Sequence, residues 1–181
     1  LGAFYLDVLK DRLYTTAPKS LARRSAQTAL HQITHAMLRW MAPFLSFTAE
    51  EAWTTFGKSE SIFLETFTDL GAIDTALIGK WQYIEDLRKH LNKQIEEKRT
   101  QGLIGSSLQA EIHFSCDPES FDVLSSLGKD LKFVFIVSKI TLEKVEIGQM
   151  IGVKASEATK CERCWHYSDD VGHNPAHPTL C

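Results

Sequence analysis

Apolar residues recur at steps of three and four early in the chain, which is the period of an amphipathic helix. Pro18 and Ser20 separate this helix from an earlier one, and Pro43 stops or kinks it. The residues that share its apolar face are Ala26, Leu30, Ile33, Met37, Trp40, Met41 and Phe44. Short helices joined by short loops predict a helical bundle over residues 1–72.

The next helix of this segment is expected to begin at Thr48. The threonine hydroxyl and the carboxylate of Glu51 have the spacing of a capping box, in which each satisfies a free backbone amide. The helix is expected to run to about Phe56, with Gly57 closing it. Trp53 falls on the apolar face and is expected in the core.

Residues 73–155 show a different pattern. A long amphipathic helix is expected from Asp74 until the glycines at 102 and 105, and another starts at Asp117-Pro118. Alternating apolar and polar positions indicate strands. The expected strands are residues 108–114, 132–137 and 140–147. The order helix, strand, helix, strand, strand predicts a small α+β domain, so the fold class is a multi-part α+β protein.

The tail, residues 156–181, carries three of the four cysteines. Cys161 and Cys164 are separated by two residues, and Cys181 follows Cys164 after sixteen more. Two thiolates at the first spacing can face one tetrahedral ion, and the second spacing is typical of a zinc ribbon whose second pair is half present. We therefore expect one structural Zn²⁺ held by Cys161, Cys164 and Cys181 in a truncated zinc-ribbon or knuckle tail.

The fourth zinc ligand stays open. In a longer chain it is expected to be another cysteine a few residues past Cys181, whereas here water or a histidine of the loop would complete the site. The histidines available are His166, His173 and His177. The alternative is three free or buried thiols that hold no metal. The clustering favours metal over disulfides and a reducing compartment such as the cytoplasm.

The formal net charge of -3 argues against a uniformly basic nucleic-acid binder, but basic side chains concentrate in residues 1–39. Several polar side chains of the second helix recur at steps of three and four, opposite its apolar face. With the preceding lysine they form a ridge suited to phosphate contact: Lys19, Arg23, Arg24, Gln27, His31 and His35. The alternative is a solvated helix face with no ligand.

Arg163 and Trp165 flank the second cysteine of the tail. An arginine fixed by a metal knuckle beside an exposed indole can stack on a nucleotide base and pair with its phosphate. The alternative for Trp165 is that it packs the small zinc core, which has few other apolar residues.

The sequence lacks the motifs of several kinds of enzyme and of membrane or secreted proteins. No nucleophile stands in a recognisable base context, and the glycine-rich stretch at 102–107 lacks the Lys-Ser/Thr of a nucleotide-binding loop, so it is expected to be a turn. No secretory signal or membrane-spanning apolar run is present. We expect no catalytic residue in this chain. An amphipathic pattern already under way at Phe4 and the lack of an initiator Met suggest a piece of a longer protein.

Several stretches together resemble one family. They are FYLD at 4–7, KDRLY at 10–14, RRS at 23–25, QTAL at 27–30, RWMAPFLSFTAEE at 39–51 and CERCW at 161–165. The part of the long stretch at 42–51, APFLSFTAEE, is similar in the related valyl and leucyl enzymes. The cysteine motif, followed by DVG at 170–172 and HP at 177–178, narrows the resemblance to the isoleucyl enzymes. The chain resembles the C-terminal part of the bacterial-type isoleucyl-tRNA synthetases, which are class I enzymes.

The resemblance implies a parent enzyme that activates isoleucine with ATP and charges tRNA(Ile). The ATP-binding catalytic domain and the editing domain would lie outside this chain. The chain would be a non-catalytic, tRNA-binding part on the anticodon side, with contacts from Arg163, Trp165 and the basic ridge. The implied parent is a cytoplasmic monomer without membrane contact, and the fragment alone is expected to self-associate through exposed apolar residues. The alternative is a zinc-ribbon nucleic-acid-binding or interaction module unrelated to charging.

Overall fold

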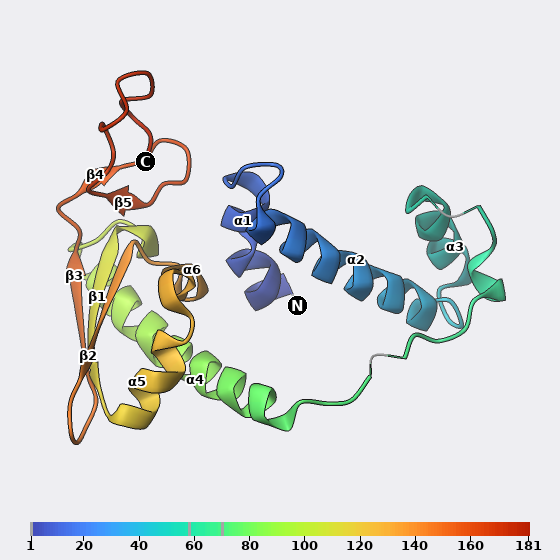
Figure 1. The fold of residues 1–181 in the computed structure, drawn as a ribbon, viewed down its shortest axis with the longest axis horizontal. Helices are drawn as coiled ribbons and strands as arrows, with labels where there is room; N and C mark the ends of the chain where they lie inside the picture. The colour runs from blue at the N-terminus through green and yellow to red at the C-terminus, as the bar shows by residue number, and fades with distance from the viewer. Residues whose placement is uncertain (1, 58, 70) are drawn as a thin grey trace. The chain divides into compact units, whose positions relative to one another are not determined.

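The computed structural model describes residues 2–57, 59–69 and 71–181, which form two compact units (Figure 1). The α+β unit comprises Leu1–Asp11 and Asp74–Cys181, and the helical unit comprises Arg12–Ile73. The helices are α1 (Lys10–Tyr14), α2 (Leu21–Met41), α3 (Ser46–Thr55), α4 (Thr75–Thr100), α5 (Pro118–Ser125) and α6 (Leu131–Phe135). The strands are β1 (Ala110–Cys116), β2 (Lys139–Lys144), β3 (Met150–Ala155), β4 (Thr159–Lys160) and β5 (Tyr167–Ser168).

Single turns of other helix types complete these elements. They are a π-helical turn at Gly2–Leu6 and 3-10 turns at Ile62–Leu64, Ser107–Gln109 and Gly128–Asp130. Within the described residues, no helix combines the length and the apolar character needed to cross a membrane.

The helical unit is built on α2 and α3, which pack around a small core. Ser20 caps α2, because its hydroxyl accepts a hydrogen bond from the Arg23 amide at 3.2 Å. The helix ends before Pro43, as the sequence predicts. Trp53 is 1% exposed, so the predicted core position is confirmed. The buried core residues are Leu38, Ala42, Ala49, Trp53 and Ile62.

The predicted capping box at Thr48 is wrong. Helix α3 begins two residues earlier, at Ser46, and its N-cap Leu45 offers no side-chain hydrogen bond. The neighbouring Glu50 has a separate role, because its carboxylate accepts hydrogen bonds from the Ser61 hydroxyl at 3.1 Å and the Ile62 amide at 2.9 Å. These contacts join α3 to the 3-10 turn at Ile62–Leu64.

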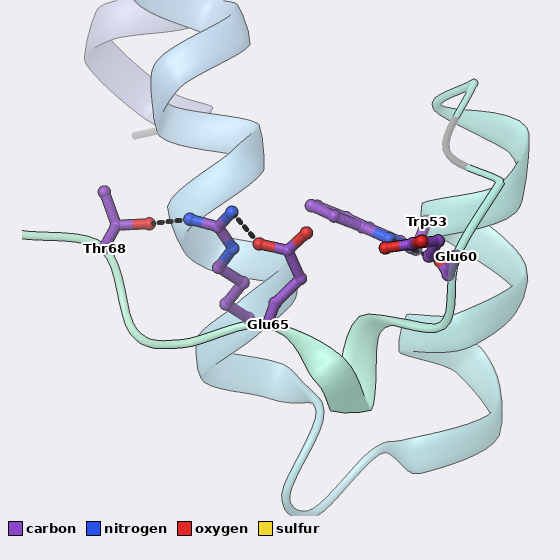
Figure 2. A network of polar contacts seen from close by, with 5 residues as sticks. Trp53, Glu60, Glu65 and Thr68 are labelled. Atoms are coloured by element: carbon purple, nitrogen blue, oxygen red, sulfur yellow. Dashed lines mark hydrogen bonds and ion pairs between the residues drawn. The ribbon is translucent and has the colours of Figure 1, made fainter.

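Arg39 fastens the segment after α3 to α2 (Figure 2). Its guanidinium donates one hydrogen bond to the Thr68 hydroxyl at 2.8 Å and another to the carboxylate of Glu65. The same guanidinium lies 5.5 Å from the ring centroid of Trp53, whose indole N–H donates to the Glu60 carbonyl at 3.1 Å. This basic side chain is thus committed to internal contacts and is not part of a free basic surface.

The apolar face predicted for α2 is only partly buried. Trp40 is 46% exposed and Phe44 is 71% exposed, while Phe47 at the start of α3 is 93% exposed. Helix α3 packs instead against the turn that carries His35, whose ring lies 4.6 Å from the ring of Trp53. The helical unit therefore presents several exposed aromatic side chains near the α2–α3 corner.

The α+β unit has a three-stranded sheet in the order β2-β1-β3, with β1 parallel to β2 and antiparallel to β3. Ile112 and Phe114 of β1 pack with Ile84, Leu91 and Leu124 in one hydrophobic core. Helix α4 is capped by Asp74, as its predicted start implies, and α5 follows Asp117-Pro118. The α+β composition of this segment is confirmed.

The predicted strand at 132–137 is wrong, because residues 131–135 form helix α6. Leu131, Val134 and Phe135 are buried, and their spacing puts them on one face of a helix. A short apolar run fits either a buried strand or a buried helix, so its periodicity does not decide between them. Strands β3, β4 and β5 lie outside the strands predicted from the sequence.

The first residues of the chain pack with the α+β unit, whereas the sequence division grouped residues 1–72 with the helical bundle. Phe4 lies edge-on to Trp81 of α4, with ring centroids 6.1 Å apart. The Arg88 guanidinium lies 5.2 Å from the centroid of the Phe4 ring and 3.9 Å from the carboxylate of Asp7. The aromatic and charged partners of this segment on α4 explain its place in the α+β unit.

Candidate metal centre and nucleic-acid interface

A two-stranded hairpin positions the first two cysteines of the tail. Strand β4 pairs with β5, and the turn between them holds Cys161 and Cys164. The Cys161 amide donates to the His166 carbonyl at 2.8 Å, and the Trp165 amide donates to the Cys161 carbonyl at 2.9 Å. Trp165 has a left-handed backbone with φ of 64°, which reverses the chain after the second cysteine. We call residues 161–165 the knuckle.

The third cysteine returns to the knuckle. The sulfur atoms of Cys161, Cys164 and Cys181 all lie within 4.8 Å of one another, and those of Cys164 and Cys181 are 3.5 Å apart. The Glu162 amide donates to the Thr179 carbonyl at 3.1 Å, which ties the end of the chain to the turn. In the described part of the chain, none of the loop histidines joins this cluster.

The protonation of the three thiols differs. Burial, the largest influence on Cys161, opposes ionisation, but hydrogen bonds from the backbone amides of Cys164, Cys181 and Arg163 lower the pKa of its thiol to about 7. Burial raises the pKa of Cys164 to about 12 and also raises the pKa of Cys181. One sulfur is thus prepared as a thiolate, and the other two are the more costly to ionise without a cation beside them.

This donor set fits a zinc ion. Three sulfur atoms converge on one point, and backbone N–H groups aimed at the Cys161 sulfur stabilise the thiolate form that zinc requires. A bound divalent cation would favour the ionised form of all three thiols. Cys161, Cys164 and Cys181, predicted as ligands from their spacing, are therefore brought together, and the site supports one structural zinc.

The knuckle is docked on the body of the α+β unit. His166 is 3% exposed, and its ring meets Phe133 of α6 edge-on with centroids 5.4 Å apart. Burial lowers the pKa of His166, although Asp11, whose carboxylate lies 4.0 Å from Nδ1, acts in the opposite direction. The Tyr167 amide donates to the Ser138 hydroxyl at 2.6 Å, which joins β5 to the start of β2.

The knuckle presents its aromatic side chain to solvent. Trp165 is 60% exposed, so the alternative in which it packs a zinc core is not observed. The ammonium of Lys160 lies 5.4 Å from the centroid of the indole ring. Arg163 is also exposed. An exposed indole flanked by cationic side chains is suited to stacking on a nucleobase and to pairing with a phosphate.

The basic ridge predicted on α2 belongs to the helical unit, not to the unit that carries the knuckle. Lys19, Arg24, Gln27 and His31 are exposed, and Arg23 is half-buried. The ring of His31 lies 4.9 Å from that of Phe56 and 5.5 Å from that of His35. We call Lys19, Arg23, Arg24, Gln27 and His31 the α2 basic surface.

Two residues of the knuckle region were not predicted from the sequence. Lys160 acquires its place beside Trp165 through the pairing of β4 with β5, which two-residue strands do not signal. His166 was considered only as a metal ligand, whereas it packs against Phe133. His166 lies two residues after Cys164 and directly before β5. This position fits a metal ligand as well as a packing residue, so the sequence does not distinguish the two roles.

Two families match the sequence. Residues 1–114 match the anticodon-binding domain of tRNA ligase, and residues 159–181 match a zinc finger found in FPG and IleRS. The second match covers the hairpin and all three cysteines of the cluster.

Individual proteins are also similar over the whole chain. An isoleucine–tRNA ligase of Paraburkholderia phytofirmans is 56% identical over 186 residues, and one of Ralstonia pickettii is 56% identical over 191 residues. An isoleucine–tRNA ligase of Burkholderia cenocepacia is 55% identical over 186 residues. Each alignment covers 100% of this chain but 20% of the relative, so the chain spans about one fifth of the length of these enzymes.

Proposed function

Because the chain belongs to the family of anticodon-binding domains of tRNA ligases, we propose that it is the tRNA-binding, C-terminal region of an isoleucine–tRNA ligase. The observation that carries this proposal is the match of residues 1–114 to that family together with identities of 55–56% to isoleucine–tRNA ligases over the whole chain. The zinc-finger match at the tail supports the same assignment.

The protein that contains this region would activate isoleucine with ATP and transfer it to tRNA(Ile) in the cytoplasm. The chain supplies no residue to that chemistry in our proposal. Its role is to bind the tRNA away from the reacting groups, so that phosphate contacts fix the register and unpaired anticodon bases are read by side chains.

The knuckle is the proposed base-contacting element. Trp165 offers an exposed ring face, and Arg163 and Lys160 supply positive charge next to it. Stacking of one base on an aromatic ring contributes about 1–3 kcal/mol to binding of single-stranded nucleic acid. The docking of His166 on Phe133 supports this role, because a base-contacting side chain needs a fixed support.

Zinc, when bound to Cys161, Cys164 and Cys181, would cross-link the hairpin to the end of the chain and supply no reaction chemistry. The protein's own contribution is the set of backbone amides that hold the Cys161 sulfur and the hydrogen bond from Glu162 to Thr179. With the turn fixed before RNA arrives, Arg163 and Trp165 lose less conformational entropy on binding.

The α2 basic surface is the proposed phosphate-contacting element of the helical unit. Between Arg12 and Arg39 the chain has no acidic residue, so the positive side chains of α2 are not neutralised by neighbours in sequence. The backbone amide of Arg23 donates a hydrogen bond to the Ser20 hydroxyl. The side chains of Arg23, Lys19 and Arg24 are the groups proposed to contact a polyanion.

The oligomeric state is a separate part of the proposal. A full ligase would be a monomer, whereas this chain alone would self-associate through exposed apolar side chains of the helical unit. Phe44, Phe47 and Leu64 are 71–93% exposed, which is unusual for a soluble monomer when such residues are grouped. Sedimentation at several protein concentrations would reveal the association, and its absence at high concentration would refute it.

Binding of tRNA(Ile) to the zinc-loaded chain tests the proposed function. We expect binding that weakens as salt rises, because phosphate contacts release counterions. Arg163→Ala and Trp165→Ala should each weaken it by roughly tenfold or more, as expected for loss of a stacking or charged contact. Lys144→Ala is the control, because Lys144 lies at the end of β2 opposite to the end that contacts β5 through Ser138. If the zinc-loaded chain binds no tRNA at low salt, the proposal is wrong.

A further inference from the structure

A second surface of the α+β unit lies beside the knuckle. It is a groove of about 720 Å³ where α6, the start of β2 and β5 meet. Its lining combines three lysines with aromatic rings. The residues that define this lysine groove are Lys129, Lys132, Lys139, Phe133 and Tyr167. The volume falls within the range of sites that enclose small organic groups.

The lysines of the groove lack close ion-pair partners, although Glu111 attracts Lys139 and Asp170 attracts Lys132 at longer range. Among the described residues, no ion pair joins Lys129, Lys132 or Lys139 to a carboxylate within 4.0 Å. Four other lysines of the unit do form such pairs: Lys10, Lys89, Lys144 and Lys154. The ammonium of Lys132 lies 5.1 Å from the centroid of the Phe133 ring. Three unpaired ammonium groups around one depression favour an anionic ligand.

Two carboxylates also line the groove. Glu111 is already engaged, because it accepts a hydrogen bond from the Ser156 hydroxyl at 2.7 Å and lies 3.3 Å from the ammonium of Lys154. Asp169 is exposed at the rim. The lining therefore keeps a net positive charge after these two acids are counted.

The walls of the groove are fixed before any ligand binds. Ile136 adopts a left-handed backbone with φ of 55°, a costly conformation for a β-branched residue, and it turns the chain from α6 into β2. Ser138 is 5% exposed and anchors this turn, since its amide donates to the Ala110 carbonyl at 3.1 Å. Its hydroxyl accepts the Tyr167 amide, which holds β5 against the same turn.

We infer that the lysine groove binds an unpaired nucleotide of the RNA that the knuckle contacts, with its phosphate on the lysines and its base against Phe133 and Tyr167. The inference rests on the proposed function and extends the RNA-binding surface beyond Arg163 and Trp165. Tyr167 lines the groove and follows Trp165 by two residues, so the groove and the exposed indole involve adjacent parts of one hairpin. Aromatic faces and cationic rims are the usual combination for unpaired nucleotides.

The test compares two triple variants of the full chain, both loaded with zinc. One is Lys129→Gln/Lys132→Gln/Lys139→Gln. The control, Lys89→Gln/Lys93→Gln/Lys98→Gln on α4, removes the same total charge from the same unit. Each is titrated with a labelled anticodon stem-loop RNA at several salt concentrations. The logarithmic salt slope should fall by about 0.7 for the groove variant, since the groove holds one phosphate and each single-strand phosphate contact contributes about that much. It should stay near wild type for the control.

A second measurement keeps the inference testable if the triple variant folds poorly. A stem-loop RNA with photoreactive thiouridine in the loop is cross-linked to the wild-type chain, and the modified peptide is identified by mass spectrometry. Cross-links at Tyr167 or Phe133 support the groove. Cross-links confined to Trp165 contradict it.

The outcomes separate this inference from the proposed function. If the wild-type chain binds RNA and the groove and control variants have equal affinity and salt slope, the groove assignment is wrong and the tRNA-binding function stands. If the wild-type chain binds no RNA, both are wrong. If an oligoglutamate peptide displaces RNA from the groove at equal charge concentration, the groove is a general anion site and the nucleotide assignment is overturned.

Discussion

His166 and Phe133 meet edge-on, with ring centroids 5.4 Å apart and ring planes at 78°. The contact joins the residue that follows the knuckle to α6, a helix in the body of the α+β unit (Figure 1). The hydrogen bond from the Tyr167 amide to Ser138 reinforces the junction. The cysteine turn is therefore held by the protein as well as by a metal, and the two supports can be tested separately.

Replacing Phe133 with leucine should loosen the knuckle. The variant keeps an apolar side chain but loses the aromatic pair, which contributes about 0.5–1.5 kcal/mol. We expect faster hydrogen exchange at the Cys161 amide, because that amide donates to the His166 carbonyl. Phe121→Leu on α5 makes the same chemical change at a ring that contacts Lys144, whereas His166 contacts Phe133, so it should leave this exchange rate unaltered. Equal exchange rates in the two variants would refute the docking role.

Removing zinc should unfold the tail and leave the larger core folded. The hydrophobic core that contains Ile84, Leu91 and Leu124 does not include any of the three cysteines of the metal site among its described residues. A chelator should therefore change the environment of Trp165 while helical circular dichroism is largely kept. Metal analysis should give one zinc per chain, lost in Cys161→Ser and retained in Cys116→Ala. Retention of zinc by Cys161→Ser would show that the ligand set is wrong.

The acid sensitivity of the α+β unit should depend on Asp117. Hydrogen bonds from the Ser120 amide, the Gln149 side chain and the Ser120 hydroxyl lower the pKa of Asp117 from 3.8 to about 2. Because the folded pKa is the lower one, the carboxylate stabilises the fold above pH 3.8, and this stabilisation disappears as the pH falls through about 2.

Asp117→Asn keeps a side chain that can cap the helix but has no ionisable group. Position 117 should therefore make no pH-dependent contribution to the stability of this variant between pH 4 and pH 2. The urea midpoint of wild type relative to Asp117→Asn should therefore fall as the pH is lowered from 4 to 2, the range over which the folded-state carboxylate becomes protonated. Glu119→Gln removes one carboxylate from the same helix and serves as the charge control. A wild-type advantage that is constant or grows on acidification would contradict the assignment.

The contact between Arg39 and Glu65 should be measurable by a double-mutant cycle. Their side chains are 17% and 33% exposed, so the pair is only partly screened by solvent. With Arg39→Met, Glu65→Gln and the double variant, we expect a coupling free energy of about 1 kcal/mol in urea unfolding followed by the NMR signal of the Trp53 indole N–H. A coupling near zero would mean that the packing of Arg39 on Trp53, and not the ion pair, holds the segment.

The sequence predicts the long elements well. Pro43 predicts the end of α2, Asp74 predicts the start of α4, and Gly102 predicts its end. These predictions succeed because capping and helix-breaking residues act on the residues next to them. Strand β1 and helix α5 follow from alternation and from Asp117-Pro118. The cysteines of the zinc site are predictable for a similar reason, since the spacing of two ligands in one turn fixes their geometry.

What the sequence does not predict depends on distant partners. The apolar run in α6 becomes a helix because its buried face packs on the core, and α3 begins at Ser46 without the side-chain cap predicted at Thr48. The tRNA contacts proposed for Arg163, Trp165 and the α2 basic surface stay predictions, because the residue types allow either RNA binding or solvation. Their exposure in the structure permits the first.

The central claim is that the zinc-fixed knuckle binds tRNA. The most direct measurement is the affinity of the chain for tRNA(Ile) before and after zinc removal, at matched ionic strength, with Trp165→Ala titrated in parallel. The account predicts that zinc removal and Trp165→Ala each weaken binding by roughly tenfold or more, and that the two effects are not additive because both act through the same ring. Affinity that is unchanged by zinc removal and by Trp165→Ala would contradict it.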